Sequence, residues 1–115
     1  MSMFTYAVKK VVKVIDGDTV DVVLDLGFNV AITQRIRVRN INSAETRTKD
    51  LEEKTQGLAA KAFAEDWFSQ GNIVVKTYKD DKYGRMLGDF FREEENFAES
   101  AILGGFAVPY DGGKR

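Results

Sequence analysis

The sequence contains no cysteine and no histidine. These absences exclude disulfide scaffolds, zinc sites built from cysteine and histidine, thiol nucleophiles and histidine general bases. Any acid–base chemistry therefore has to use carboxylates, lysine, tyrosine or arginine. A catalytic metal would be a hard cation bound by oxygen atoms.

Long apolar runs are also missing, because none approaches the roughly 20 residues that span a bilayer. We therefore expect no membrane segment. The first residues show no charged segment followed by an apolar one, so no secretory signal is visible and the chain as it stands is expected to be cytoplasmic, unless a signal was removed.

The 115 residues are 43% hydrophobic and 30% charged, with a single proline, and contain no repeat or linker composition. This balance predicts one globular domain over residues 1–115, with a core at about 8–110 and a monomer as the default state. Because 17 basic residues face 18 acidic ones, no overall field attracts a polyanion, and an anionic ligand needs a local basic patch.

Period-2 patterns and turn residues predict strands, and three- and four-residue spacings predict helices. Leu58, Ala59, Ala62, Phe63 and Trp67 give a helix an apolar face, and Gly71 suits its end. A second helix begins at Asn96, with Glu99 placed for a capping box, and ends at the Gly104–Gly105 pair. The strands are predicted at residues 8–15, 20–26, 29–41, 73–78 and 85–91.

The order is therefore three strands, a helix, two strands and a short helix near the C-terminus. Five short strands with a helix after the third are typical of an OB-type barrel, a mainly β fold of the α+β class. An open α+β sheet is the competing interpretation.

Two motifs lie in the first two fifths of the chain. The run Asp16-Gly17-Asp18-Thr19 offers two carboxylates around a flexible glycine and suits Ca²⁺, although such a turn often only connects a hairpin. Arg35, Arg37 and Arg39 alternate with apolar residues, so they share one strand face. That face either binds a phosphate or pairs with Asp21 and Asp25 on the neighbouring strand.

Two further polar segments carry candidate groups. In residues 42–46, Glu45 is either a general base or a carboxylate in the first turn of a helix, and Asn42 can donate a metal-binding oxygen. Residues 81–85 combine Lys82, Tyr83 and Arg85, and a plain hairpin loop explains them equally.

Taken together and in this order, the motifs resemble those of the staphylococcal nuclease-like (thermonuclease) family. The matching segments are VIDGDT at 14–19, RVRNINSAET at 37–46, GLAAKAF at 57–63 and DKYGR at 81–85. The resemblance runs from about residue 8 to residue 110.

The resemblance implies a calcium-dependent hydrolase, an endonuclease that cleaves DNA or RNA, single-stranded or exposed, to leave 3′-phosphate and 5′-hydroxyl ends. It implies catalytic roles for Arg37, Glu45 and Arg85. The metal would be held by Asp18, Asn42 and the Ser43 backbone carbonyl, with Asp16 supporting them. Nucleotide contacts are implied for Lys82, Tyr83 and, as a weaker match, Tyr110.

Three features depart from the family pattern. Asn42 replaces the usual aspartate ligand and brings no charge, so a weaker metal affinity is expected. Ala44 replaces the usual proline before the catalytic glutamate, and the chain ends where well-known members continue into another helix. A catalytically weak or inactive OB-type module that binds nucleic acid or protein is therefore the alternative, and a scaffold domain with a mere interaction surface is a further one.

Overall fold

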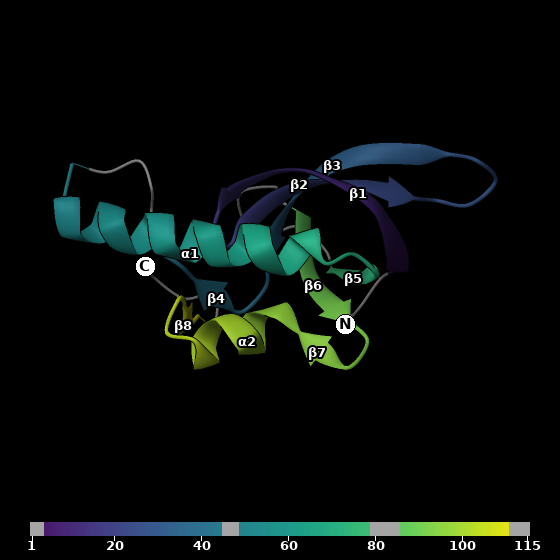
Figure 1. Cartoon of the computed structure of the whole chain (residues 1–115). Helices are drawn as coiled ribbons and strands as arrows, with labels where there is room; N and C mark the ends of the chain where they lie inside the picture. The colour runs from purple at the N-terminus through teal and green to yellow at the C-terminus, as the bar shows by residue number, and fades with distance from the viewer. Residues whose placement is uncertain (1–3, 45–48, 79–85, 111–115) are drawn as a thin grey trace.

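The computed structural model describes residues 4–44, 49–78 and 86–110. The predicted strands and helices occur in the predicted order, together with three short strands that the sequence did not predict (Figure 1). Along the chain they are β1 (Phe4–Asp16), β2 (Thr19–Asp25), β3 (Ala31–Val38), β4 (Ile41–Asn42), α1 (Leu51–Ser69), β5 (Ile73–Tyr78), β6 (Met86–Arg92), β7 (Glu95–Asn96), α2 (Phe97–Leu103) and β8 (Val108–Pro109).

Five strands form a closed barrel. β3, β2, β1, β5 and β6 are neighbours in that order and pair antiparallel, and a short parallel pairing of β3 with β6 closes the ring. This seam joins Ile36, Arg37 and Val38 to Met86, Leu87 and Gly88. The predicted OB-type α+β fold is thereby confirmed, and the open sheet is excluded.

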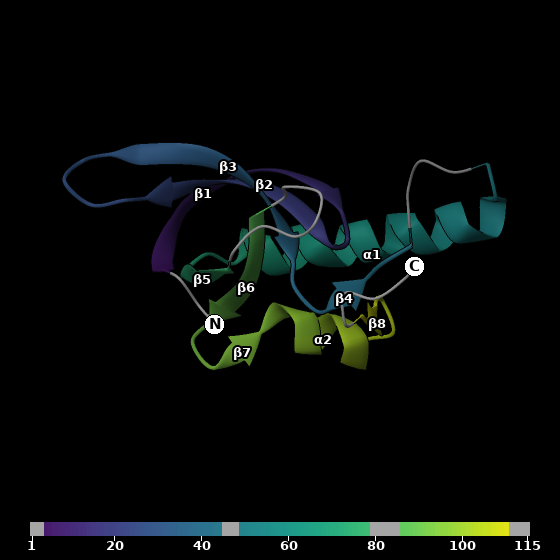
Figure 2. The same ribbon diagram turned by 180° about the vertical axis from the view of Figure 1, so that it is seen from behind.

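Alternation along the strands separates core from solvent. In β2, Val20, Val22 and Leu24 are at most 3% exposed, whereas Asp25 is exposed and Asp21 is half-buried. Inward-facing aliphatic side chains of this kind stabilise a closed sheet because their apolar surface is buried away from water. The β2–β3 hairpin then extends beyond the barrel, as both views show (Figures 1 and 2).

Helix α1 begins earlier and buries a different face than predicted. Asp50 caps it by accepting the N–H groups of Glu52 and Glu53. Trp67 is buried as expected, but Leu58 is 50% exposed, and Ala59 and Ala62 are also exposed. The buried positions are the small residues and the aromatic pair on the side of the helix that meets the barrel: Gly57, Ala60, Ala64, Trp67 and Phe68.

Helix α2 begins and ends where the sequence predicts. Asn96 is its N-cap and accepts the N–H of Glu99, and Gly104 is its C-cap. Phe97 packs against Trp67 and Phe68 of α1, so the two helices share one apolar cluster with the barrel. Neither helix has the length and apolarity needed to cross a membrane.

Candidate nucleic-acid site

The structure describes six of the ten predicted site residues. Five of them gather where the β1–β2 turn, the end of β3 and β4 meet: Asp18, Arg37, Asn42, Ser43 and Tyr110. Asp16 is half-buried at the end of β1. The other four predicted residues lie outside the described residues: Glu45, Lys82, Tyr83 and Arg85.

Asp18 is fixed by the backbone that follows β4. Its carboxylate accepts hydrogen bonds from the Ser43 N–H at 3.0 Å and from the Thr19 hydroxyl at 3.0 Å. The neighbouring Gly17 permits this approach, because a Cβ there would lie 2.7 Å from Ala60 Cβ and 2.9 Å from the Ser43 side chain. Gly17 is thus explained by close packing against α1, rather than by the sharp turn that the sequence suggested.

Arg37 is the charged group at the centre of the site. Its side chain is 4% exposed, and one guanidinium nitrogen lies 3.6 Å from the Asp18 carboxylate. The same nitrogen donates to the amide oxygen of Asn42, and the other terminal nitrogen donates to the Val38 carbonyl at 2.7 Å. A buried arginine held in this way presents a fixed positive charge.

Tyr110 reaches the site through the short β4–β8 sheet. Its N–H donates to the Asn40 carbonyl at 2.8 Å, and its ring centroid lies 5.5 Å from the Arg37 guanidinium carbon. This is a cation–π distance. The family resemblance implied Tyr110 as a weaker match for a nucleotide contact, and the structure brings its ring to Arg37.

The neighbouring arginines have separate partners. Arg35 forms a bidentate pair with Asp21, with distances of 2.7 and 3.1 Å. This is the pairing that the sequence analysis gave as the alternative to phosphate binding. Arg39 instead pairs with Asp89 at 3.2 Å and lies over the Tyr78 ring at 4.1 Å. The alternation therefore identified the strand correctly, but the three guanidinium groups do not form one phosphate-binding face.

Asp89, Tyr78 and Arg39 form a cluster that the sequence analysis did not predict. Burial and a hydrogen bond with Asp89 raise the pKa of Tyr78 above its ordinary value. Because the register pairs Lys76 with Asp89 across β5 and β6, only the folded hairpin brings these groups to Arg39. No local sequence signal identifies Asp89 as the partner of Arg39.

The donors at the site have the chemistry of a hard-cation site. Asp18 offers a carboxylate, Asn42 an amide oxygen and Ser43 a backbone carbonyl, all of them ligand types that Ca²⁺ accepts. One nitrogen of Arg37 contacts both Asp18 and Asn42, so their oxygens converge on one place. Among residues 4–44, 49–78 and 86–110, however, no three acidic groups gather as a metal cluster.

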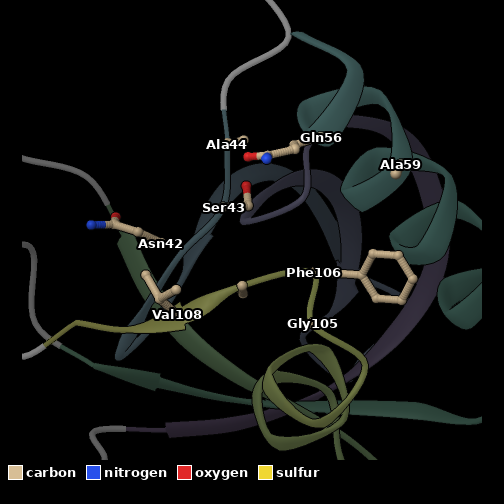
Figure 3. A pocket seen from close by; sticks show the side chains of 9 residues that line it. Asn42, Ser43, Ala44, Gln56, Ala59, Gly105, Phe106 and Val108 are labelled. Atoms are coloured by element: carbon tan, nitrogen blue, oxygen red, sulfur yellow. The ribbon is translucent and has the colours of Figure 1, made fainter. Parts of the chain in front are cut away.

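A pocket of about 430 Å³ adjoins the site on the side of α1. The side chains of Asn42 and Ser43 point in different directions, and the Ser43 hydroxyl points toward Gln56 (Figure 3). This hydroxyl oxygen is buried and has no hydrogen-bond partner within the described part of the chain. The pocket lining comes from three segments: Asn42, Ser43, Ala44, Gln56, Ala59, Gly105, Phe106, Ala107 and Val108.

Two comparisons relate the chain to known proteins. A family model described as "Staphylococcal nuclease homologue" matches residues 35–114. The chain is also 36% identical over 81 residues to "Protein ParB" of Escherichia coli. That match covers 69% of this chain but 38% of the relative, so the chain spans well under half of that protein.

Proposed function

Since the chain belongs to the family of staphylococcal nuclease homologues, we propose that it is a calcium-dependent nuclease that hydrolyses phosphodiester bonds of DNA or RNA. The observation that carries the proposal is the buried Arg37 guanidinium held between Asp18 and Asn42, with the Tyr110 ring beside it. The substrate is single-stranded or exposed nucleic acid, and the products carry 3′-phosphate and 5′-hydroxyl ends.

Hydrolysis of this kind forms a bond from water oxygen to phosphorus and breaks the bond from phosphorus to the 5′ oxygen. Negative charge develops on the phosphate oxygens during attack. A fixed guanidinium stabilises that charge without having to reorganise. Such preorganised electrostatic stabilisation is the largest contribution to rate enhancement in many enzymes. Arg37 has this role in the proposal, and Arg85 is the second catalytic arginine.

Glu45 takes the proton of the attacking water, because a carboxylate is one of the few bases available in a chain without histidine. Asp18, Asn42 and the Ser43 carbonyl would hold the calcium ion, and Asp16 would support them. The ion would supply Lewis-acid stabilisation of the phosphate. Lys82, Tyr83 and Tyr110 would orient the nucleotide.

Single-stranded DNA labelled at its 5′ end tests the proposal in three reactions: with Ca²⁺, with EDTA, and with Ca²⁺ and the Glu45→Gln variant. We expect cleavage only in the first reaction, with 3′-phosphate ends on the labelled products. Cleavage that continues in EDTA would contradict the calcium requirement. Undiminished cleavage by Glu45→Gln would contradict the role of the glutamate.

One observation favours a second candidate, a nucleic-acid-binding module with little or no catalysis. Arg37 already bonds to Asn42 and lies near Asp18, so a cation has to compete with the guanidinium for both oxygens. DNA binding without cleavage, even at millimolar Ca²⁺, would identify this candidate.

A further inference from the structure

We propose that the outer face of the β5–β6 hairpin binds the single-stranded segment that flanks the cleaved phosphodiester. We call this surface the β5–β6 outer face and define it by Val74, Lys76, Tyr78, Asp89 and Phe91, together with Arg39. The inference rests on the proposed function, because it extends the substrate path away from the same site.

The strand register places these side chains together. Val74 is paired with Phe91 and Lys76 with Asp89, and paired residues share a face of the sheet. The alternate residues, Val75 and Phe90, are fully buried in the barrel. The β5–β6 outer face therefore points away from the core, and Lys76 and Val74 on it are exposed.

Positive charge and aromatic rings alternate on this face. The Lys76 ammonium lies 5.1 Å from the centre of the Phe91 ring, and the Arg39 guanidinium carbon lies 4.1 Å from that of Tyr78. Proteins that bind single strands combine cations for the phosphates with rings or guanidinium planes on which bases stack. Both parts of that chemistry are present here.

Asp89 holds the arrangement in place. It lies 3.2 Å from Arg39, it is 12% exposed in its side chain, and it shares a hydrogen bond with Tyr78. The Arg39 side chain remains 36% exposed. The guanidinium is thus held over the tyrosine ring while part of it stays accessible to a ligand.

The face is continuous with the candidate site. Arg39 follows Arg37 by two residues, and its N–H donates to the Gly88 carbonyl of β6 at 2.9 Å. The sequence of the hairpin connection, residues 79–85, contains the predicted nucleotide contacts Lys82 and Tyr83 and the predicted catalytic residue Arg85. A single-stranded nucleic acid that leaves the site along this hairpin meets Arg39 and Tyr78 first, and then Lys76 and Phe91.

The outer face of β1–β3 is the rival surface, and its chemistry fits less well. The register aligns Lys13, Asp21 and Arg35 in one row, where the carboxylate already pairs with Arg35. The next row places Lys10 beside Val23 and Thr33. These rows contain no aromatic ring on which a base can stack, and they supply a matched control.

Binding is measured in EDTA, so that cleavage does not interfere, by the fluorescence anisotropy of labelled thymidine oligonucleotides. One oligonucleotide has about fifteen nucleotides and is long enough to extend past the site, and the other has about three. We expect Lys76→Ala and Arg39→Gln to weaken binding of the longer oligonucleotide roughly three- to tenfold each, and to leave the shorter one unchanged. Each variant should also reduce the slope of log K against log salt by about 0.7 per lost phosphate contact.

Lys13→Ala removes the same charge from the β1–β3 face and is expected to bind both oligonucleotides like the wild type. Arg39→Lys keeps the charge but loses the flat guanidinium, so an intermediate loss is expected. Thermal unfolding of each variant shows whether it is folded. Equal losses in Lys13→Ala and Lys76→Ala, equal affinity for the two lengths, or no binding of either would overturn the proposal.

Cleavage of the short oligonucleotide separates this inference from the proposed function. If both hold, Lys76→Ala and Arg39→Gln cleave it like the wild type. If nothing is cleaved but the longer oligonucleotide binds through Lys76 and Arg39, the catalytic proposal fails and the binding face stands.

Discussion

Arg37 shows how a single residue can link the fold to the site. It is a strand residue at the barrel seam, and its guanidinium bonds to the Val38 carbonyl and to Asn42. Burying a charge is unfavourable unless hydrogen bonds and an opposite charge compensate it, and here Asp18 supplies the opposite charge. The residue is therefore held in one place before any substrate arrives.

The shape of this side chain is the basis of a first prediction. Arg37→Lys keeps the charge but loses the planar fork that contacts two acceptors at once. We expect kcat on single-stranded DNA to fall roughly 100-fold, the size of effect seen when one preorganised donor is removed. Arg35→Lys, on the exposed Asp21 pair, is the matched control and should keep its rate. A wild-type rate for Arg37→Lys would remove Arg37 from the mechanism.

The amide at position 42 leads to a second prediction. Asn42→Asp adds a carboxylate where Asp18 and Ser43 already offer oxygens, so Ca²⁺ should bind about tenfold more tightly in calorimetry, since ligand charge tunes affinity. Cleavage should rise with it. Asn40→Asp adds the same charge in the neighbouring exposed turn and should leave Ca²⁺ affinity unchanged. Equal affinity of Asn42→Asp and wild type would show that residue 42 does not bind the ion.

The motifs named the five residues that the structure brings together, but not their mutual contacts. Arg37 is identified by its strand and motif, whereas its bond to Asn42 depends on the turn between β3 and β4. Tyr110 is brought close by β8, a two-residue strand without a period of its own. Such contacts between distant or very short segments leave no local sequence signal.

Strand β6 has little room for a larger side chain at Gly88. A Cβ there would lie 2.8 Å from a Val75 methyl and 2.9 Å from an Ile36 methyl, both inside the barrel. Gly88→Ala should therefore lower the free energy of unfolding by about 1–3 kcal/mol, the usual effect of overpacking. Urea denaturation measures it. Thr33→Ala, at an exposed position of β3, should stay within about 0.5 kcal/mol of the wild type. If Gly88→Ala lowered the free energy of unfolding no more than Thr33→Ala does, the seam would be able to expand around the added methyl group.

The β2–β3 hairpin provides a prediction on pH. Hydrogen bonding to Arg35 lowers the pKa of Asp21 below its ordinary value. A carboxyl whose folded pKa is lowered adds stability above its unfolded pKa, and this is lost as the pH falls through the folded pKa. Arg35→Gln should therefore be slightly less stable than wild type near neutral pH and equal to it once Asp21 is protonated.

The effect should be modest, because the Arg35 side chain is 62% exposed and water screens the pair. Urea denaturation at about pH 7 and about pH 2.5 compares the two states. Asp25 lies opposite Ala31 and not opposite Arg35, so Asp25→Asn serves as the control. A stability difference that stays constant over this range would assign the effect of Arg35 to packing instead of charge.

Sequence patterns predicted element types well and the buried face of α1 poorly. The capping residues of α2 are local signals, and the structure confirms them. For α1, the apolar pattern pointed to Leu58, but the helix turns Gly57 and Ala60 inward because Gly17 packs directly on Ala60. Close approach of backbones selects small residues, which hydrophobicity alone does not reveal.

At the scale of the whole molecule, the order of elements favoured the barrel, and the pairing of β3 with β6 excluded the open sheet. Three strands, a helix and two strands leave few closed arrangements. The order did not show where the barrel closes, because a parallel seam of three residue pairs has no local pattern.

The seam also determines when the site can exist. Met86 follows its partner Ile36 by 50 positions, so joining them requires a long loop to close before any contact compensates for the lost entropy. Arg37 lies within that seam. A refolding chain can therefore form its hairpins early and still lack the arrangement of side chains around Arg37. In a chain being synthesised, the site has to wait until β6 has emerged and the ring has closed.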